Sequence, residues 1–186
     1  MFGKIRDSKY DDLAVGGQPY CPYNSQPYDK LLVLMDLDGV TRILSEEYPG
    51  QDVDFKKLLI EAVDGRDCIA AFAVYTESRD MGTRKLIRRV SDCGFRLEPV
   101  PDQGSEKGDC GIAMALIAQE YALKDWCDRI VLITGETGSA YLARNLQRRG
   151  NIVEVLSFDE RAVADKVVPM SRIPLIRVDV PEEASL

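Results

Sequence analysis

The amino-acid sequence predicts an α/β protein with a mostly parallel five-stranded central sheet and helices on both faces. Short apolar runs alternate with helical patterns along the 186 residues, an order that is typical of parallel sheets. The first run, residues 31–35, is apolar throughout, as expected of a strand that is covered on both faces. The predicted strands are residues 31–35, 68–75, 95–100, 130–134 and 152–156.

Helices are expected between the strands because apolar residues recur there at intervals of three and four. The helix from 109 to 121 contains several small residues, which would let it lie close to the sheet. Gly94 and Gly150 each follow a predicted helix and suit its carboxyl end. The predicted helices are residues 52–62, 83–93, 109–121, 139–149 and, as a short helix, 159–167.

A single domain over residues 31–168 is expected, because a chain of this length needs only one core. An irregular extension rich in Pro and Tyr, residues 1–30, precedes it. An extended acidic tail, residues 169–186, follows it. We expect the N-terminal extension to dock on the domain or on a partner, which would support a homo-oligomer or a larger protein assembly.

The composition indicates a cytoplasmic protein that does not enter a membrane. Hydrophobic residues make up 45% and charged residues 30% of the chain, as in globular proteins, and no apolar run has the length of a membrane span. The first residues lack the apolar core of a signal peptide. The five cysteines are odd in number and widely spaced, so we expect reduced thiols, with Cys68 and Cys110 as small core residues.

Charged and titratable residues restrict the chemistry. The chain has no histidine, which excludes Ser-His-Asp and Cys-His catalysis and histidine-bound zinc. A net charge of −7 argues against non-specific nucleic-acid binding, which requires Lys and Arg. Basic residues are nonetheless grouped in two predicted helices, as a solvated face or a phosphate-binding surface. They are Arg84, Lys85, Arg88 and Arg89 in one helix, and Arg144, Arg148 and Arg149 in the other.

Acidic residues fall where predicted strands end or helices begin. Asp36 and Asp38 follow the first strand, and Glu136 follows the strand 130–134. Asp109 opens the apolar helix 109–121. Ligands of parallel α/β sheets bind outside the carboxyl ends of the strands, so these acids are expected to converge. Oxygen-rich sites suit Mg²⁺ or Mn²⁺, and the pattern therefore favours metal-dependent phosphate chemistry.

Except for Asp36, which directly follows a run expected to be buried, these positions also have a purely structural interpretation. Asp38 followed by Gly39 is typical of a turn, and Asp109 is a good helix N-cap. The segment 134–139 joins a predicted strand to a predicted helix, and the backbone N–H groups at the start of such a helix favour a bound anion. In the structural interpretation, Glu136 or Ser139 caps this helix.

Taken in order, these segments resemble the NYN family of PIN-like nucleases. The family pattern has a strand ending in Asp, a strand ending in Tyr, a Lys-Gly-Asp sequence opening an apolar helix, and a strand ending in Ser-Gly-Asp. The matching segments are residues 34–36, 53–59, 72–75, 94–101, 107–109, 133–136 and 150–155. The resemblance covers about residues 31–157.

The resemblance implies a PIN-like three-layer sandwich that hydrolyses RNA phosphodiester bonds with Mg²⁺ or Mn²⁺, as an endoribonuclease. It implies catalytic roles for Asp36, Asp109 and Glu136, and the same three residues with Asp38 as metal ligands. The implied substrate-binding residues are Lys107, Arg84, Arg88, Arg148 and Ser139.

Departures from the family pattern keep other functions open. Gly39 stands where the family usually has Asn, Glu136 where it has Asp, and Gly138 where it has a second Asp. A catalytically reduced member that serves in binding or assembly is therefore one alternative. Another is a phosphatase of the haloacid-dehalogenase type, because Asp36-Leu37-Asp38-Gly39 also resembles the first motif of that family. Asp36 would then be the nucleophile, Asp38 the general acid–base and Thr76 a phosphate ligand.

Overall fold

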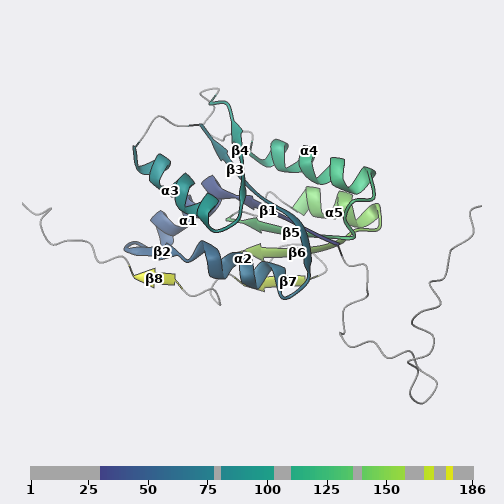
Figure 1. Ribbon diagram of the computed structural model, residues 1–186, viewed down its shortest axis with the longest axis horizontal. Coiled ribbons are helices and arrows are strands. Elements are labelled where there is room, and N and C mark those ends of the chain that lie inside the picture. Colours follow the sequence, from purple (N-terminus) through teal and green to yellow (C-terminus); the bar gives the residue numbers. More distant parts are fainter. Residues whose placement is uncertain are drawn as a thin grey trace, which may run out of the picture.

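A computed structural model describes residues 30–77, 81–102, 110–135, 140–157, 166–169 and 175–177. Its centre is a six-stranded sheet in the order β4-β3-β1-β5-β6-β7, in which every neighbouring pair is parallel (Figure 1). The strands are β1 (Lys30–Asp36), β3 (Asp67–Thr76), β4 (Arg96–Val100), β5 (Arg129–Thr134), β6 (Ile152–Ser157) and β7 (Lys166–Pro169). The predicted α/β class and all five predicted strands are confirmed, and β7 is a sixth.

Five described helices cover the two faces of the sheet, and two short strands form a separate antiparallel pair. The helices are α1 (Leu37–Glu47), α2 (Phe55–Val63), α3 (Met81–Asp92), α4 (Cys110–Leu123) and α5 (Ala140–Arg148). The short pair is β2 (Gln51–Val53) with β8 (Leu175–Arg177), which lies in the predicted C-terminal tail. Among the described helices, none is long and apolar enough to cross a membrane.

Three elements differ from the prediction. Helix α1 was not predicted, although Asp36 caps it and its buried residues recur at helical spacing. The predicted helix 52–62 begins only at Phe55, because Asp54 is its N-cap and the preceding residues form β2. The short helix predicted over 159–167 is wrong at its end, because Lys166 and Val167 belong to β7, which pairs with β6. Its earlier part lies outside the described residues.

Strand β1 is the centre of two hydrophobic cores, one on each face of the sheet. Leu31, Val33 and Met35 pack under α1, α2 and α3, whereas Leu32 and Leu34 pack under α4 and α5. All five side chains are fully buried. The continuous apolar run in the sequence is therefore explained by burial on both faces.

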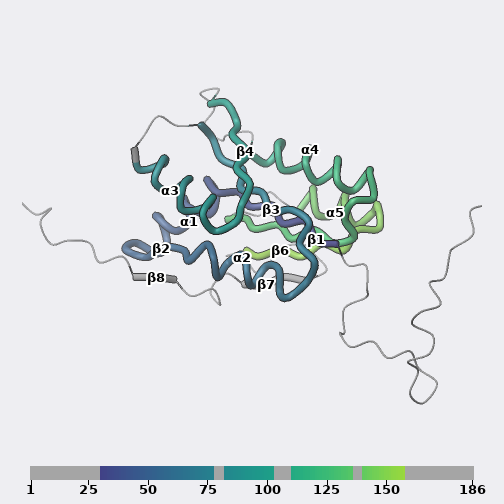
Figure 2. The backbone as a smooth tube through the Cα atoms, in the orientation of Figure 1, coloured from purple at the N-terminus to yellow at the C-terminus, as the bar shows by residue number. Residues whose placement is uncertain are grey.

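The order of the strands reverses at β1. From β1 the chain adds β3 and then β4 on one side. It then crosses the face that α4 and α5 cover and adds β5, β6 and β7 on the other side (Figure 2). The carboxyl ends of β1 and β5 therefore border a topological switch point, the usual ligand site of open α/β sheets.

Candidate functional site

Asp36 lies at the carboxyl end of β1 and is the N-cap of α1. The backbone N–H of Gly39 donates to its Oδ1 (3.0 Å), which is the typical bond of an Asp cap. Burial raises the pKa of this carboxyl above its ordinary value, and the charge of Asp38 raises it further. The Gly39 N–H and the charge of Arg42 act in the opposite direction. Asp36 is thus a half-buried acid whose negative charge is poorly solvated.

Asp38, in the first turn of α1, joins three elements. Its Oδ2 accepts from the backbone N–H of Thr76 (2.9 Å), at the end of β3, and from the thiol of Cys110 (3.5 Å), the first residue of α4. Burial raises the pKa of Cys110 to about 12, so this thiol keeps its proton at neutral pH and can donate it. Asp38 therefore holds the start of α4 against the carboxyl ends of β1 and β3.

Gly135 brings the end of β5 against α1. A Cβ atom at this position would lie 2.2 Å from the carbonyl oxygen of Gly39, a distance at which backbone would have to move. Glycine is thus required for the close approach of the two segments. The chain leaves β5 directly beside the turn that Asp36 caps.

Four sequence-predicted site residues, Lys107, Asp109, Glu136 and Ser139, lie outside the described residues. Their neighbours in the chain are informative. Cys110 follows Asp109 and contacts Asp38, and Gly135 precedes Glu136 and lies against Gly39. Two segments that carry predicted acids therefore meet the Asp36–Gly39 turn from two sides.

The part of the chain that the structure describes contains no group of three or more Asp, Glu or Cys residues that could hold a metal ion. The donor chemistry nevertheless fits a divalent cation. Of the two carboxylate oxygens of Asp36, only Oδ1 accepts a hydrogen bond from a described residue. Because the pKa of this carboxyl is raised, a cation beside it would stabilise its negative charge. Carboxylate oxygens are also the ligands that Mg²⁺ and Mn²⁺ prefer.

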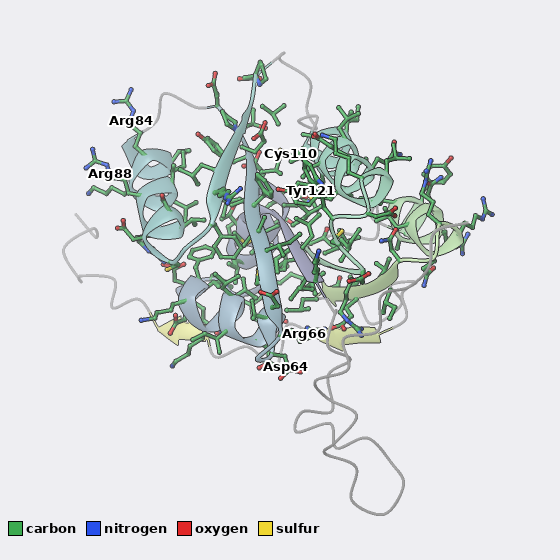
Figure 3. All side chains as sticks on the ribbon, turned by 45° about the vertical axis from the view of Figure 1, so that its right-hand side comes forward. Asp64, Arg66, Arg84, Arg88, Cys110 and Tyr121 are labelled. Carbon is green, nitrogen blue, oxygen red and sulfur yellow. The ribbon has the colours of Figure 1, made fainter. Side chains whose placement is uncertain are left out.

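The predicted basic substrate ligands do not form one patch. Arg84 and Arg88 are exposed on α3, which begins after the carboxyl end of β3, and Figure 3 shows both projecting away from the body of the protein. Arg148 is exposed in the last turn of α5, which lies on the other face and runs back toward the amino ends of the strands. Arg84 and Arg88 are therefore nearer the Asp36 edge of the sheet than Arg148 is.

Sequence reasoning missed the roles of Cys110, Thr76 and Gly135 in this site. Cys110 is buried, as predicted for a core residue, but the bond to Asp38 was not foreseen. Its position directly after a candidate acid was an available signal. Gly135, between a strand end and a second candidate acid, was another.

The NYN domain family model matches residues 30–171, more than half of the chain. The chain belongs to the NYN domain family. Among solved structures, it is similar to a protein of unknown function from Vibrio parahaemolyticus, with a TM-score of 0.70 and 24% identity. The similarity covers 83% of this chain and 100% of the other, and it shows the fold alone. No curated protein matches the chain.

Membership of the NYN family suggests a PIN-like nuclease domain. NYN domains are PIN-like nuclease domains, which in general act on RNA and use divalent metal ions. The six-stranded parallel sheet with helices on both faces is consistent with the PIN-like sandwich.

Proposed function

We propose that this NYN domain is a metal-dependent ribonuclease whose site lies at the carboxyl ends of β1 and β5. The observation that carries the proposal is the meeting of three segments at one turn. Cys110 and Gly135, the chain neighbours of Asp109 and Glu136, both contact the turn that begins at Asp36. A parallel sheet with its switch point at this turn is built to bind a ligand there.

Asp36, Asp109 and Glu136 are the proposed metal ligands. Asp36 is held in place by the Gly39 N–H, while its second oxygen faces no described donor. A divalent ion such as Mg²⁺ or Mn²⁺ would supply a water of lowered pKa and would stabilise charge on the phosphate. Lys107, Ser139, Arg84 and Arg88 are proposed to bind phosphates of the substrate, since the two arginines lie on the helix that starts at this edge.

Asp38 is proposed to position the site and not to bind the metal directly. One of its oxygens already accepts two hydrogen bonds, from Thr76 and from Cys110. Because Cys110 directly follows Asp109, these bonds fix the point at which α4 begins. Groups that orient metal ligands in this way matter less than the ligands themselves, but their loss still lowers activity.

A binding or assembly module with reduced catalysis is the second candidate, and Gly39 favours it. The family usually has Asn at this position, whereas a Cβ here would lie 2.4 Å from Oδ2 of Asp36. The glycine therefore leaves Asp36 without the neighbouring Asn side chain of the family pattern. Gly138 also lacks the second Asp of the family pattern, which removes one negative charge from the expected ligand set.

The test is cleavage of a labelled single-stranded RNA in Mn²⁺ or Mg²⁺ by the wild type, Asp36→Asn and Asp38→Asn. Asn caps a helix as well as Asp does, so Asp36→Asn should fold. We expect it to lower the cleavage rate by at least about a hundredfold. Asn at 38 keeps an oxygen for the Thr76 N–H, and we expect a loss of about tenfold with unchanged dependence on metal concentration.

Each result has a defined meaning. Cleavage that chelation does not remove, or that Asp36→Asn retains, would refute the proposed site. A folded wild type that binds RNA without cutting it would support the binding module. If Asp38→Asn requires much more metal than the wild type, Asp38 is itself a ligand, as the sequence predicted.

A further inference from the structure

The outer face of α4 is apolar and exposed. Ile112, Leu116 and Leu123 are 61%, 64% and 65% exposed, whereas Cys110, Met114 and Ala118 on the opposite side of the same helix are buried against the sheet. A surface helix usually turns charged residues to solvent, and one that is apolar all round is usually covered on both sides. Among the described residues, however, none covers the outer side of α4.

The exposed residues lie at the spacing of a helix–helix contact. Positions 112, 116, 119 and 123 follow one another at intervals of four, three and four residues. This is the alternation that forms the seam of a two-helix coiled coil, and it gives a nearly straight stripe along the helix. Gln119, which is half-buried, is the only polar member of the stripe.

The stripe lacks the negative charge that would keep two copies of the chain apart. The net charge is −7, so two copies repel each other over most of their surface. Within α4, however, no charged residue precedes Glu120, and the amine of Lys124 forms a salt bridge with Glu120. The stripe is therefore almost neutral, and the cores of protein interfaces are depleted of charge in the same way.

We propose that α4 packs against α4 of a second copy of the chain, antiparallel about a two-fold axis. Such a contact is self-complementary, because when one residue of the first helix meets a different residue of the second helix, the two-fold axis repeats the same pair in reverse. Ile112 would meet Leu123 of the partner subunit, and Leu116 would meet Gln119 of the partner subunit. The only polar residue of the stripe would thus lie beside the two-fold axis and not at a distant edge.

The size of the surface predicts a reversible dimer. Fourteen residues of helix are about 21 Å long, which is short for a standard interface of about 800 Å² on each partner. We expect a dissociation constant of about 1–100 µM.

Sedimentation equilibrium of the full chain over a range of concentrations tests the proposal, with the wild type, Leu116→Glu and Ile60→Glu. Ile60, on α2, is 61% exposed and provides a matched control on the other face of the sheet. Leu116→Glu should raise the dissociation constant by at least about a hundredfold, since it places two carboxylates in the contact. Ile60→Glu should leave the dissociation constant unchanged.

Gln119→Leu provides a change in the opposite direction. It completes the apolar stripe, and we expect the dissociation constant to fall by about tenfold or more. A wild type that stays monomeric, as it would if residues 1–29 or another protein covered α4, overturns the proposal. A dimer that Leu116→Glu leaves intact overturns it as well. Far-UV circular dichroism of each variant excludes unfolding as the cause.

Discussion

At the scale of single residues, Asp36 combines a structural and a chemical requirement. As an N-cap it stabilises α1, but burial and the nearby charge of Asp38 make its ionised form unfavourable. Removing solvent from a carboxylate costs free energy unless a cation or several donors replace the water. A divalent cation bound as proposed above would offset this cost, which the metal-free protein bears alone.

The stability of the metal-free protein should therefore respond to pH through Asp36. Because its pKa is raised on folding, the native state binds the proton more tightly than the unfolded state. Stability should fall as pH rises from the unfolded pKa through the raised native one. Asp36→Asn cannot ionise, so its stability relative to the wild type should increase as pH rises across this window.

Urea unfolding in a chelator between acidic and neutral pH measures this difference. The wild type and Asp36→Asn should differ least at the lowest pH, where the wild-type carboxyl is protonated in both states. If the relative stability of Asp36→Asn instead falls as pH rises, the carboxyl has a lowered native pKa, and its charge is stabilised without a metal.

At the scale of elements, the strands were predictable and α1 was not. The runs that form β1, β3, β5 and β6 are apolar apart from Glu154 in β6, and they are covered on both faces, so burial defines them. In α1, Asp38 and Gly39 are typical turn residues, and only the cap by Asp36 and the packing of the helix on the sheet override them. Strand β7 has four residues at the edge of the sheet, and its short sequence has no distinct period.

In the candidate site too, features set by local sequence could be predicted, whereas contacts between distant segments could not. The strand-end position of Asp36 could be read from the sequence. The hydrogen bonds of Asp38 with Thr76 and Cys110 could not be read from it, because these partners lie 38 and 72 positions further along the chain. Such contacts depend on the relative placement of β1, β3 and α4, which no local pattern determines.

A buried cluster of charges joins β6, β5 and the turn before β3, and its loss should destabilise the fold. Glu154 in β6 is only 3% exposed and accepts from Arg66, which precedes β3, and from Arg129 in β5 (2.7 Å). Glu154→Gln removes the charge that compensates two arginines while keeping the shape of the side chain. We expect the free energy of unfolding to fall by about 2–4 kcal/mol in urea denaturation.

Glu46→Gln is the matched control for this variant. Glu46 forms an exposed salt bridge with Arg42 within α1 (3.8 Å), and its removal should change stability by less than about 0.5 kcal/mol. Equal losses in the two variants would mean that the buried cluster contributes no more than a surface pair.

At the scale of the whole molecule, the distribution of charge decides how an acidic protein could bind RNA. A net charge of −7 repels a polyanion, so binding depends on where the arginines lie. Arg84 and Arg88 are exposed on the helix that starts at the Asp36 edge of the sheet. Arg144 and Arg148 are equally exposed, but they lie on α5, on the opposite face.

Two double variants with the same change in net charge distinguish direct contact between arginines and RNA phosphates from a general effect of the total charge of the protein. We expect the double variant Arg84→Ala, Arg88→Ala to bind RNA more weakly. The plot of log affinity against log salt should become less steep by about 1.4, because each phosphate contact with a single strand contributes about 0.7 to the slope and two contacts are lost. Arg144→Ala with Arg148→Ala should leave that slope nearly unchanged. Fluorescence anisotropy at several salt concentrations measures both. Equal effects would show that only the total charge matters, and a larger effect of the α5 pair would place the RNA on the face formed by α4 and α5.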